Sequence, residues 1–199
     1  MSERVLPDQW ETPRLRLRPF HGGDVEDVVA FASDEQWGRF LSVPRPYGVP
    51  EARAFLAIQL VADPAREPRW ALEHEGRVVG SVELSLDTSE DGSAVFGALH
   101  FALARPLWGR GLASEAVTSV VDRAFTTLPD LIRIASHADV RNVGSWRVME
   151  KAGLLREGVL RSARVLRGER IDDVVYAVLR EDWVARRGVQ TAASGAGSP

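Results

Sequence analysis

Apolar and polar positions in the N-terminal part of the chain follow two different periods. Residues 14–20 alternate basic and apolar side chains, and this period of two predicts an amphipathic strand. Residues 22–24, Gly-Gly-Asp, break the pattern and precede a helix expected from about Val25 to Ser33. A second helix is expected from Pro50 to Ala62, with proline in its first turn. The segment from Trp37 to Val49 is rich in aromatic residues and prolines, which is typical of a structured loop.

The centre of the chain has strand-like periods. Residues 70–73, 78–86 and 94–103 are separated by short polar turns that contain glycine. Because a short turn joins only the neighbouring strands of a hairpin, these three segments should form an antiparallel meander.

The clearest helical period in the sequence follows this meander. From Leu112 to Leu128 the apolar residues form one stripe, with polar residues opposite. The remaining pattern predicts a strand at 131–135, a helix at 142–152 that ends at Gly153, and a final strand at 173–179. Together these elements predict an α/β (α+β) fold in which helices flank one mixed, mostly antiparallel central sheet.

The length of 199 residues suits one domain. We expect this domain to span residues 1–187. Residues 188–199 are small and polar, and we expect them to form a disordered tail.

Composition narrows the classes of function. The chain has no cysteine, which excludes a disulfide scaffold, a thiolate metal site and a cysteine nucleophile, and we expect no metal. A net charge of -3 without a block of like charge disfavours a nucleic-acid partner. The N-terminus lacks a secretion pattern, and no apolar run reaches the roughly 20 residues that span a bilayer. We therefore expect a cytoplasmic protein that makes no membrane contact.

The main chemical signal is the segment 105–116, Arg-Pro-Leu-Trp-Gly-Arg-Gly-Leu-Ala-Ser-Glu-Ala, which opens the clearest helix. Gly109 and Gly111 allow the backbone to approach a ligand closely. The free N–H groups of the first helical turn, added to the helix dipole, form an anion site that suits a pyrophosphate. Arg110 adds a charge-assisted contact. A tight turn that binds nothing explains the same pattern equally well.

The same segment does not match two other phosphate-binding motifs. A nucleotide P-loop ends in Gly-Lys-Ser or Gly-Lys-Thr, and the chain has neither. A dinucleotide fingerprint needs a third glycine where this chain has Ser114, and the order of its strands differs from the order predicted here.

Segment 105–116 resembles the acyl-CoA-binding motif of the GNAT acetyltransferase superfamily. Its Trp-Gly-x-Gly form is similar to the RimJ/RimL-like branch, the ribosomal-protein N-terminal acetyltransferases. Segments 11–18, 139–153 and 172–176 are similar to the first strand, the Asn-x-x-Ser helix and the last strand of that branch. The resemblance covers roughly residues 10 to 183, and its specificity comes from the order of the motifs.

This resemblance implies a splayed fourth strand and acetyl-CoA as the acyl donor. The backbone of Phe101, Ala102 and Leu103 would pair with the pantetheine arm and polarise the thioester carbonyl. Asn142 would bind the same arm, and Ser145 would protonate the leaving thiolate. The residues that would hold the pyrophosphate are Trp108, Gly109, Arg110, Gly111, Leu112, Ala113 and Ser114.

The chain departs from the family pattern in two places. Pro106 stands three residues before the first glycine, where Gln or Arg is usual, and Gly97 and Ala98 occupy the region where related sequences often carry an acidic residue. The candidate base is therefore Glu83, on a central strand, although a solvated strand face explains Glu83 as well. His100 titrates near neutrality but is more often structural in such a position.

These residues predict an N-acetyltransferase that carries an acetyl group from acetyl-CoA to a primary amine by direct attack, without a covalent enzyme intermediate. The favoured acceptor is the α-amine of a protein or peptide N-terminus. The alternatives are a small-molecule amine, such as an antibiotic, and a non-catalytic acyl-CoA-binding protein. Trp37, Phe40 and Tyr47 would either wall the acceptor site or close the core. The family also makes a homodimer a possible assembly.

Overall fold

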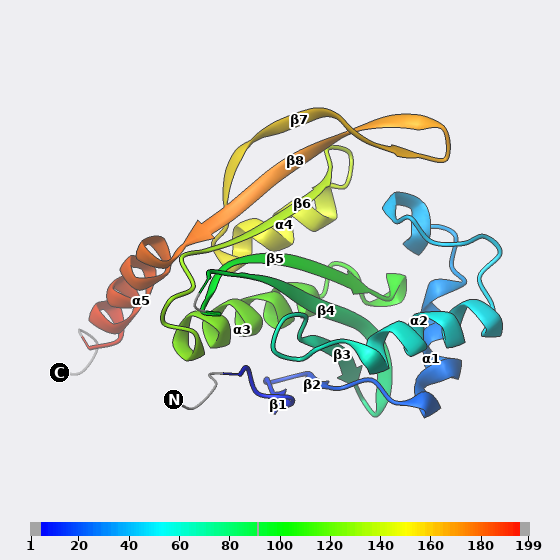
Figure 1. Ribbon diagram of the computed structural model, residues 1–199, viewed down its shortest axis with the longest axis horizontal. Helices are drawn as coiled ribbons and strands as arrows, with labels where there is room; N and C mark the ends of the chain where they lie inside the picture. Colours follow the sequence, from blue (N-terminus) through cyan, green and yellow to red (C-terminus); the bar gives the residue numbers. More distant parts are fainter. Residues whose placement is uncertain (1–4, 91, 196–199) are drawn as a thin grey trace.

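The computed structural model describes residues 5–90 and 92–195. One eight-stranded sheet runs through it in the order β1-β2-β3-β4-β5-β6-β8-β7 (Figure 1). The strands are β1 (Trp10–Glu11), β2 (Arg16–Arg18), β3 (Arg69–His74), β4 (Arg77–Thr88), β5 (Ala94–Leu103), β6 (Arg133–Asp139), β7 (Leu155–Leu166) and β8 (Glu169–Leu179). Every pair is antiparallel except β5 with β6. The predicted fold class is confirmed.

Helices lie on both faces of this sheet. The α-helices are α1 (Val25–Ala32), α2 (Val49–Val61), α3 (Leu112–Thr127), α4 (Val143–Ala152) and α5 (Arg180–Gly195), and the short 3-10 helices are η1 (Gly22–Asp24), η2 (Trp37–Phe40) and η3 (Arg105–Leu107). The buried stripe of α3, including Val117 and Val120, packs in the main core with Leu84, Leu99 and Ile134 from the central strands. A second, smaller core joins α1 and α2 to the β2–β4 side of the sheet.

Within residues 5–90 and 92–195, no helix covers the opposite face of β5, β6 and β8, and we call it the open face. Burial alternates along β5: Leu99 is fully buried towards α3, whereas Ala98 and His100 are exposed on the open face. The β7–β8 hairpin projects past this face towards η2 (Figure 1). The sheet therefore presents one packed side and one accessible side at its parallel pair.

The parallel pair separates part of the way along. Strands β5 and β6 pair only from Phe96 to Ala98, although β5 continues to Leu103. The hydroxyl of Ser136 donates to the carbonyl of Leu99 at 2.7 Å where pairing stops. Beyond this point the two strands leave a gap, so β5 is splayed as the sequence resemblance implied.

Two of the longer elements were not predicted from the sequence. Strand β7 is almost entirely exposed and interrupted by register shifts near Gly158 and between Leu160 and Arg164, so it lacks a two-residue apolar period. Helix α5 continues to Gly195 and overlaps the tail predicted for 188–199, of which the last four residues lie outside the described chain. No helix in the described ranges combines the length and apolar character needed to cross a membrane.

Candidate active site

The backbone between β5 and α3 forms a loop with exposed amides. Gly109 and Gly111 have φ values of 75° and 81°, the left-handed region that favours glycine. Helix α3 starts with the N–H of Glu115 donating to the carbonyl of Gly111. Within the described chain, the N–H groups of residues 109–114 donate to no protein acceptor. Unpaired amides at a helix N-terminus form a site for an anion.

Trp108 differs from the rest of this loop. Its backbone N–H donates to the carbonyl of Arg105, and its indole Nε1 donates to the carbonyl of Leu103 at 2.7 Å. Both of its N–H groups are therefore used by the protein, and only its ring, which is half exposed, faces solvent. The unpaired amides begin at Gly109.

The N-terminal segment supports the loop from outside. Arg14 donates to the carbonyl of Arg110 at 2.8 Å and to the carboxylate of Glu115 at 2.6 Å. The hydroxyl of Thr12 donates to the same carboxylate at 2.6 Å. Burial alone would raise the pKa of Glu115, but the hydrogen bonds from Thr12 and Arg14 outweigh it and hold this pKa below its usual value. Sequence reasoning missed this support because the partners lie about a hundred residues apart in the chain.

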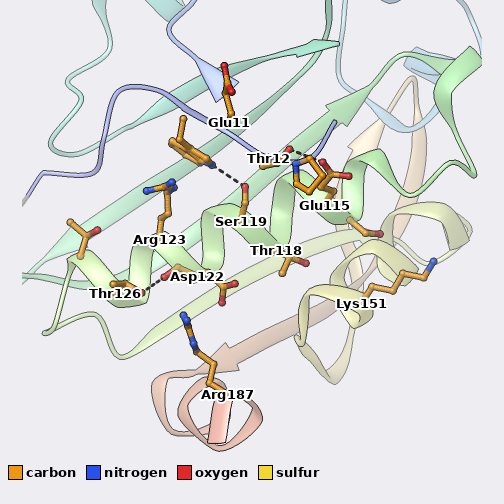
Figure 2. Close-up of a pocket in the computed structure, with 14 residues that line it drawn as sticks. Glu11, Thr12, Glu115, Thr118, Ser119, Asp122, Arg123, Thr126, Lys151 and Arg187 are labelled. Carbon is orange, nitrogen blue, oxygen red and sulfur yellow. Dashed lines mark hydrogen bonds between the residues drawn. The ribbon is translucent and has the colours of Figure 1, made fainter. Parts of the chain in front are cut away.

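A groove of about 640 Å³ runs along the outer face of α3, between this N-terminal segment and α5 (Figure 2). Two of its polar side chains bond to tryptophans: Ser119 accepts from Trp10 at 3.2 Å, and Asp122 accepts at 2.6 Å from Trp183, which lies outside the lining. The groove lies on the α3 side of the sheet, away from the open face. Its lining includes Ser114, one of the residues expected to hold the pyrophosphate, but not Phe101, Asn142, Ser145 or Glu83, which were expected to act at the thioester or the acceptor.

Backbone groups of β5 line the gap at alternate residues. The carbonyl of Leu99 points towards β6, because it accepts from Ser136, whereas the N–H of Ala104 pairs with β4. By this alternation the N–H and carbonyl of Phe101 point into the gap, and those of Ala102 belong to the β4 ladder. The carbonyl of Leu103 is taken by Trp108. Of the three predicted strand residues, Phe101 has both backbone groups directed at the gap.

Asn142 and Ser145 lie at the N-terminus of α4. The side chain of Asn142 caps this helix by accepting from the N–H of Ser145 at 3.3 Å. Ser145 is half buried, and its hydroxyl makes no hydrogen bond to the described residues. Helix α4 ends at Gly153 with φ 94°, as predicted. The Ser145 hydroxyl is therefore free to turn towards a ligand.

Glu83 faces the open side of β4. Its carboxylate accepts from the Ser85 hydroxyl at 3.2 Å and lies 3.5 Å from Nε of Arg69. The residue opposite Glu83 on β5 is His100, whose ring centroid lies 5.9 Å from that of His137 on β6. The structure thus places Glu83 beside His100, which in turn faces His137, a residue that sequence reasoning did not single out.

The aromatic residues considered from the sequence have different environments. Tyr176 is buried, and its hydroxyl donates to Glu150 at 2.9 Å, as expected for a packed core aromatic. Burial first, and then Glu150, raise the pKa of Tyr176. Trp37 in η2 packs against Phe31 at 5.3 Å between ring centroids, and Tyr47 packs against the smaller core. These contacts assign Trp37 and Tyr47 at least a packing role.

The β7–β8 hairpin is tied to the loop that contains η2. The guanidinium of Arg167, in the hairpin turn, donates to the carbonyls of Gly38, Arg39 and Leu41 at 3.1, 3.1 and 2.9 Å. These hydrogen bonds join segments that are more than 120 residues apart in sequence. The hairpin and the η2 loop therefore bound the open face together.

A loop of free amides at the mouth of a gap between two parallel strands, with an accessible polar face behind the gap, defines the class of acyl-CoA-dependent N-acyltransferases. The family described as "Acetyltransferase (GNAT) domain" matches residues 14–155. The chain belongs to this family and is an N-acetyltransferase of the GNAT type, so its acceptor is an amine.

The comparisons with individual proteins agree with this assignment. The chain is similar to the uncharacterized N-acetyltransferase p20 of Bacillus licheniformis, with 28% identity over 177 residues that cover 86% of this chain and 96% of p20. Its fold is similar to that of the microcin C7 self immunity acetyltransferase MccE, solved with acetyl-CoA and AMP (TM-score 0.74, 15% identity, 88% and 98% of the two chains). It is also similar to that of RimL, a ribosomal L7/L12 alpha-N-protein acetyltransferase solved with coenzyme A (TM-score 0.71, 16% identity, 88% and 97%). At these identities the two structures establish the fold alone.

Proposed function

We propose that the chain transfers the acetyl group of acetyl-CoA to the α-amine of a protein or peptide N-terminus. The observation that carries the proposal is the row of unpaired amides from Gly109 to Ser114 beside the β5–β6 gap. Acetyl-CoA supplies the activated acetyl thioester. The protein holds it, orients it and handles the protons of the reaction.

The residues present fit the diphosphate of this donor. An added Cβ at Gly109 would meet no atom within 4 Å, so the space beside this amide is open. Arg110 is exposed between the two glycines and offers a charge to the same ligand. The amides of Gly109, Arg110, Gly111, Leu112, Ala113 and Ser114 hold the pyrophosphate, with the Trp108 ring at the edge of the site.

The gap accommodates the arm that carries the thioester. Phe101 donates and accepts backbone hydrogen bonds there, and its N–H polarises the acetyl carbonyl. Asn142 and Ser145 face the arm from α4. The Ser145 hydroxyl donates a proton to the departing sulfur and regains one that the attacking nitrogen loses as the amide forms. No residue of the chain is acylated, because the amine attacks directly.

The favoured acceptor follows from proton chemistry. An α-amine has a pKa of about 8 and needs only a weak base, whereas a lysine side chain at about 10.4 needs a stronger one. Glu83 lies on the open face, but the guanidinium of Arg69, 3.5 Å away, partly neutralises the charge of its carboxylate and makes it a weaker base. The fold shared with RimL supports a peptide acceptor.

One observation favours a smaller acceptor. The hydrogen bonds from Arg167 to the η2 loop enclose the open face on one side and limit the size of what enters. The fold shared with MccE supports this second candidate, a small-molecule amine. A homodimer and a cytoplasmic location stay predictions.

An acceptor panel tests the proposal. Purified full-length chain is mixed with acetyl-CoA and with peptides that carry a free α-amine, peptides blocked at the α-amine but containing lysine, or small amines, and free thiol is measured. We expect thiol release with the free α-amine peptides. Release only with small amines would establish the second candidate, and binding of acetyl-CoA without release on any acceptor would show a non-catalytic binder.

A further inference from the structure

Two histidines face each other across the β5–β6 gap on the open face. His100 follows the last paired residues of β5, and the rings of His100 and His137 are edge to face with centroids 5.9 Å apart. His100 immediately precedes Phe101, whose backbone points into the gap. An acceptor that reaches the gap from the open face therefore meets these imidazoles first.

Carboxylates flank the pair on both sides. Glu83 lies opposite His100 on β4, and Arg69 on β3 lies 3.5 Å from the Glu83 carboxylate. On the other side, Nε2 of His137 lies 3.9 Å from Oδ2 of Asp173 on β8. Asp173 is 3% exposed, against 50% for His137, so a buried anion lies behind an accessible imidazole.

The buried anion is itself paired. Arg164 on β7 donates to Asp173 at 3.0 Å. Within the described part of the chain, no group of three or more ligating side chains is arranged to hold a metal. The row of Glu83, His100, His137 and Asp173 places two imidazoles between two carboxylates, and imidazoles accept and release protons near neutral pH.

The surroundings of His100 favour a neutral ring. The side chain is partly exposed to solvent, yet the protein around it desolvates the ring. Desolvation lowers the pKa of His100 from its ordinary 6.5, the negative charge of Glu83 opposes this, and the positive charge of Arg69, together with that of His137 whenever its ring is protonated, adds to it. The net direction is downward, so His100 keeps a free electron pair at neutral pH.

We propose that His100 is the acceptor-side base of this enzyme and that His137, backed by Asp173, is its positioning residue and proton outlet. This inference rests on the proposed function and replaces Glu83 as the group that accepts the proton. Glu83 then acts on the charge of His100 rather than on the acceptor.

The step is a proton transfer. An N–H bond of the acceptor ammonium breaks, its electron pair stays on nitrogen, and the proton joins the free pair of a ring nitrogen of His100. The neutral amine is then ready to attack. His100 returns to its neutral form by passing the proton to His137 or to water, so no other reactant is consumed.

The test uses the full-length chain with the substitutions His100→Gln, His137→Gln and Glu83→Gln. His21→Gln is the matched control, because His21 lies outside the open face. The turnover number is measured against pH at saturating acetyl-CoA and acceptor, and CoA affinity is measured by calorimetry. We expect His100→Gln to lower turnover about 100-fold without changing CoA affinity. It should also remove the acidic limb of the profile, where activity rises as pH passes upward through the His100 pKa.

Two further readouts separate a base from a structural residue. Added imidazole should restore part of the activity of His100→Ala. In NMR titrations of the ring signals, His137→Gln should raise the pKa of His100 by removing a like charge, and Glu83→Gln should lower it. A purely structural role predicts neither result.

The outcomes are distinguishable. If the wild type releases thiol but His100→Gln keeps its rate and its acidic limb, this assignment is overturned and the proposed function stands. If Glu83→Gln alone removes the limb, Glu83 is the base. If the wild type binds acetyl-CoA and releases no thiol on the whole panel, the proposed function falls and the assignment of His100 falls with it.

Discussion

The proposed donor side and the proposed acceptor side of this enzyme are built from different kinds of contact. The proposed donor side is one continuous segment, the loop and first turn of α3, whose backbone would supply the binding groups. The proposed acceptor side collects His100, His137, Asp173 and Arg167 from separate strands and a hairpin turn. A backbone site formed by one continuous segment can be recognised in the sequence. A face formed by side chains that are far apart in the chain can be recognised only in the folded structure.

The largest expected effect is on the turnover number of a variant at Ser145, which lies between the proposed donor and acceptor sides. Replacing Ser145 by alanine should lower the turnover number about 100-fold, because the thiolate loses its proton donor. CoA affinity should stay unchanged, since the cap from Asn142 and the loop amides remain. Steady-state kinetics and calorimetry check both statements, with Ser119→Ala on the outer face of α3 as the control. An unchanged turnover number would remove Ser145 from the mechanism.

The donor side alone is tested by Gly109→Ala. We expect CoA affinity to fall about 10- to 100-fold, which corresponds to one charge-assisted hydrogen bond of about 1.5–3 kcal/mol. Gly76→Ala is a matched control, because both glycines have φ 75° and open space at the Cβ position. Backbone strain is therefore similar in the two variants. Equal CoA affinities in the two would show that the loop does not bind the donor.

The acceptor side alone is tested by Arg167→Gln. Loss of its hydrogen bonds to the η2 loop should loosen one boundary of the open face and raise the KM of the acceptor severalfold, while CoA affinity stays constant. Arg170→Gln, on the same hairpin, is the control. A change in CoA affinity instead of acceptor KM would show that the two sides are not independent.

The smallest expected effect is on the stability at acidic pH that Glu115 contributes through its contacts with Thr12 and Arg14. The pKa of Glu115 is lowered from the ordinary 4.5 in the folded state, so the unfolded chain binds more protons as the pH falls. The stability contributed by Glu115 is complete above this ordinary value and is lost as the pH falls through the folded pKa. Denaturation at a series of acidic pH values should show that the free energy of unfolding falls less steeply with decreasing pH for Glu115→Gln than for the wild type. Equal slopes would contradict the pairing with Thr12 and Arg14.

Much of the fold could be predicted because apolar periods are local. The amphipathic stripe of Leu112–Leu128 and the alternation in 78–86 depend on neighbours in sequence, and both elements were found close to their predicted positions. Strand β7 was missed because its side chains are exposed and Gly158 lies at a register shift. Helix α5 was missed because its last residues are small and polar.

The candidate site also contains residues that could be predicted from local sequence and residues that could not. Gly109 and Gly111 could be read directly, since their left-handed backbone conformation restricts the residue type. The pairing of His137 with His100, by contrast, depends on the register of a parallel pair whose strands are separated by a whole helix. The contact of Arg14 with Glu115 spans 101 positions, and no local pattern marks it. Such contacts follow from the topology.

The central claim is that the loop amides bind the diphosphate of the acyl donor. The most direct measurement follows the backbone amide NMR signals of the wild-type chain during titration with coenzyme A. The account predicts large shifts for residues 109–114, with the Gly76 amide unmoved. Saturable binding that leaves the signals of 109–114 in place would contradict it.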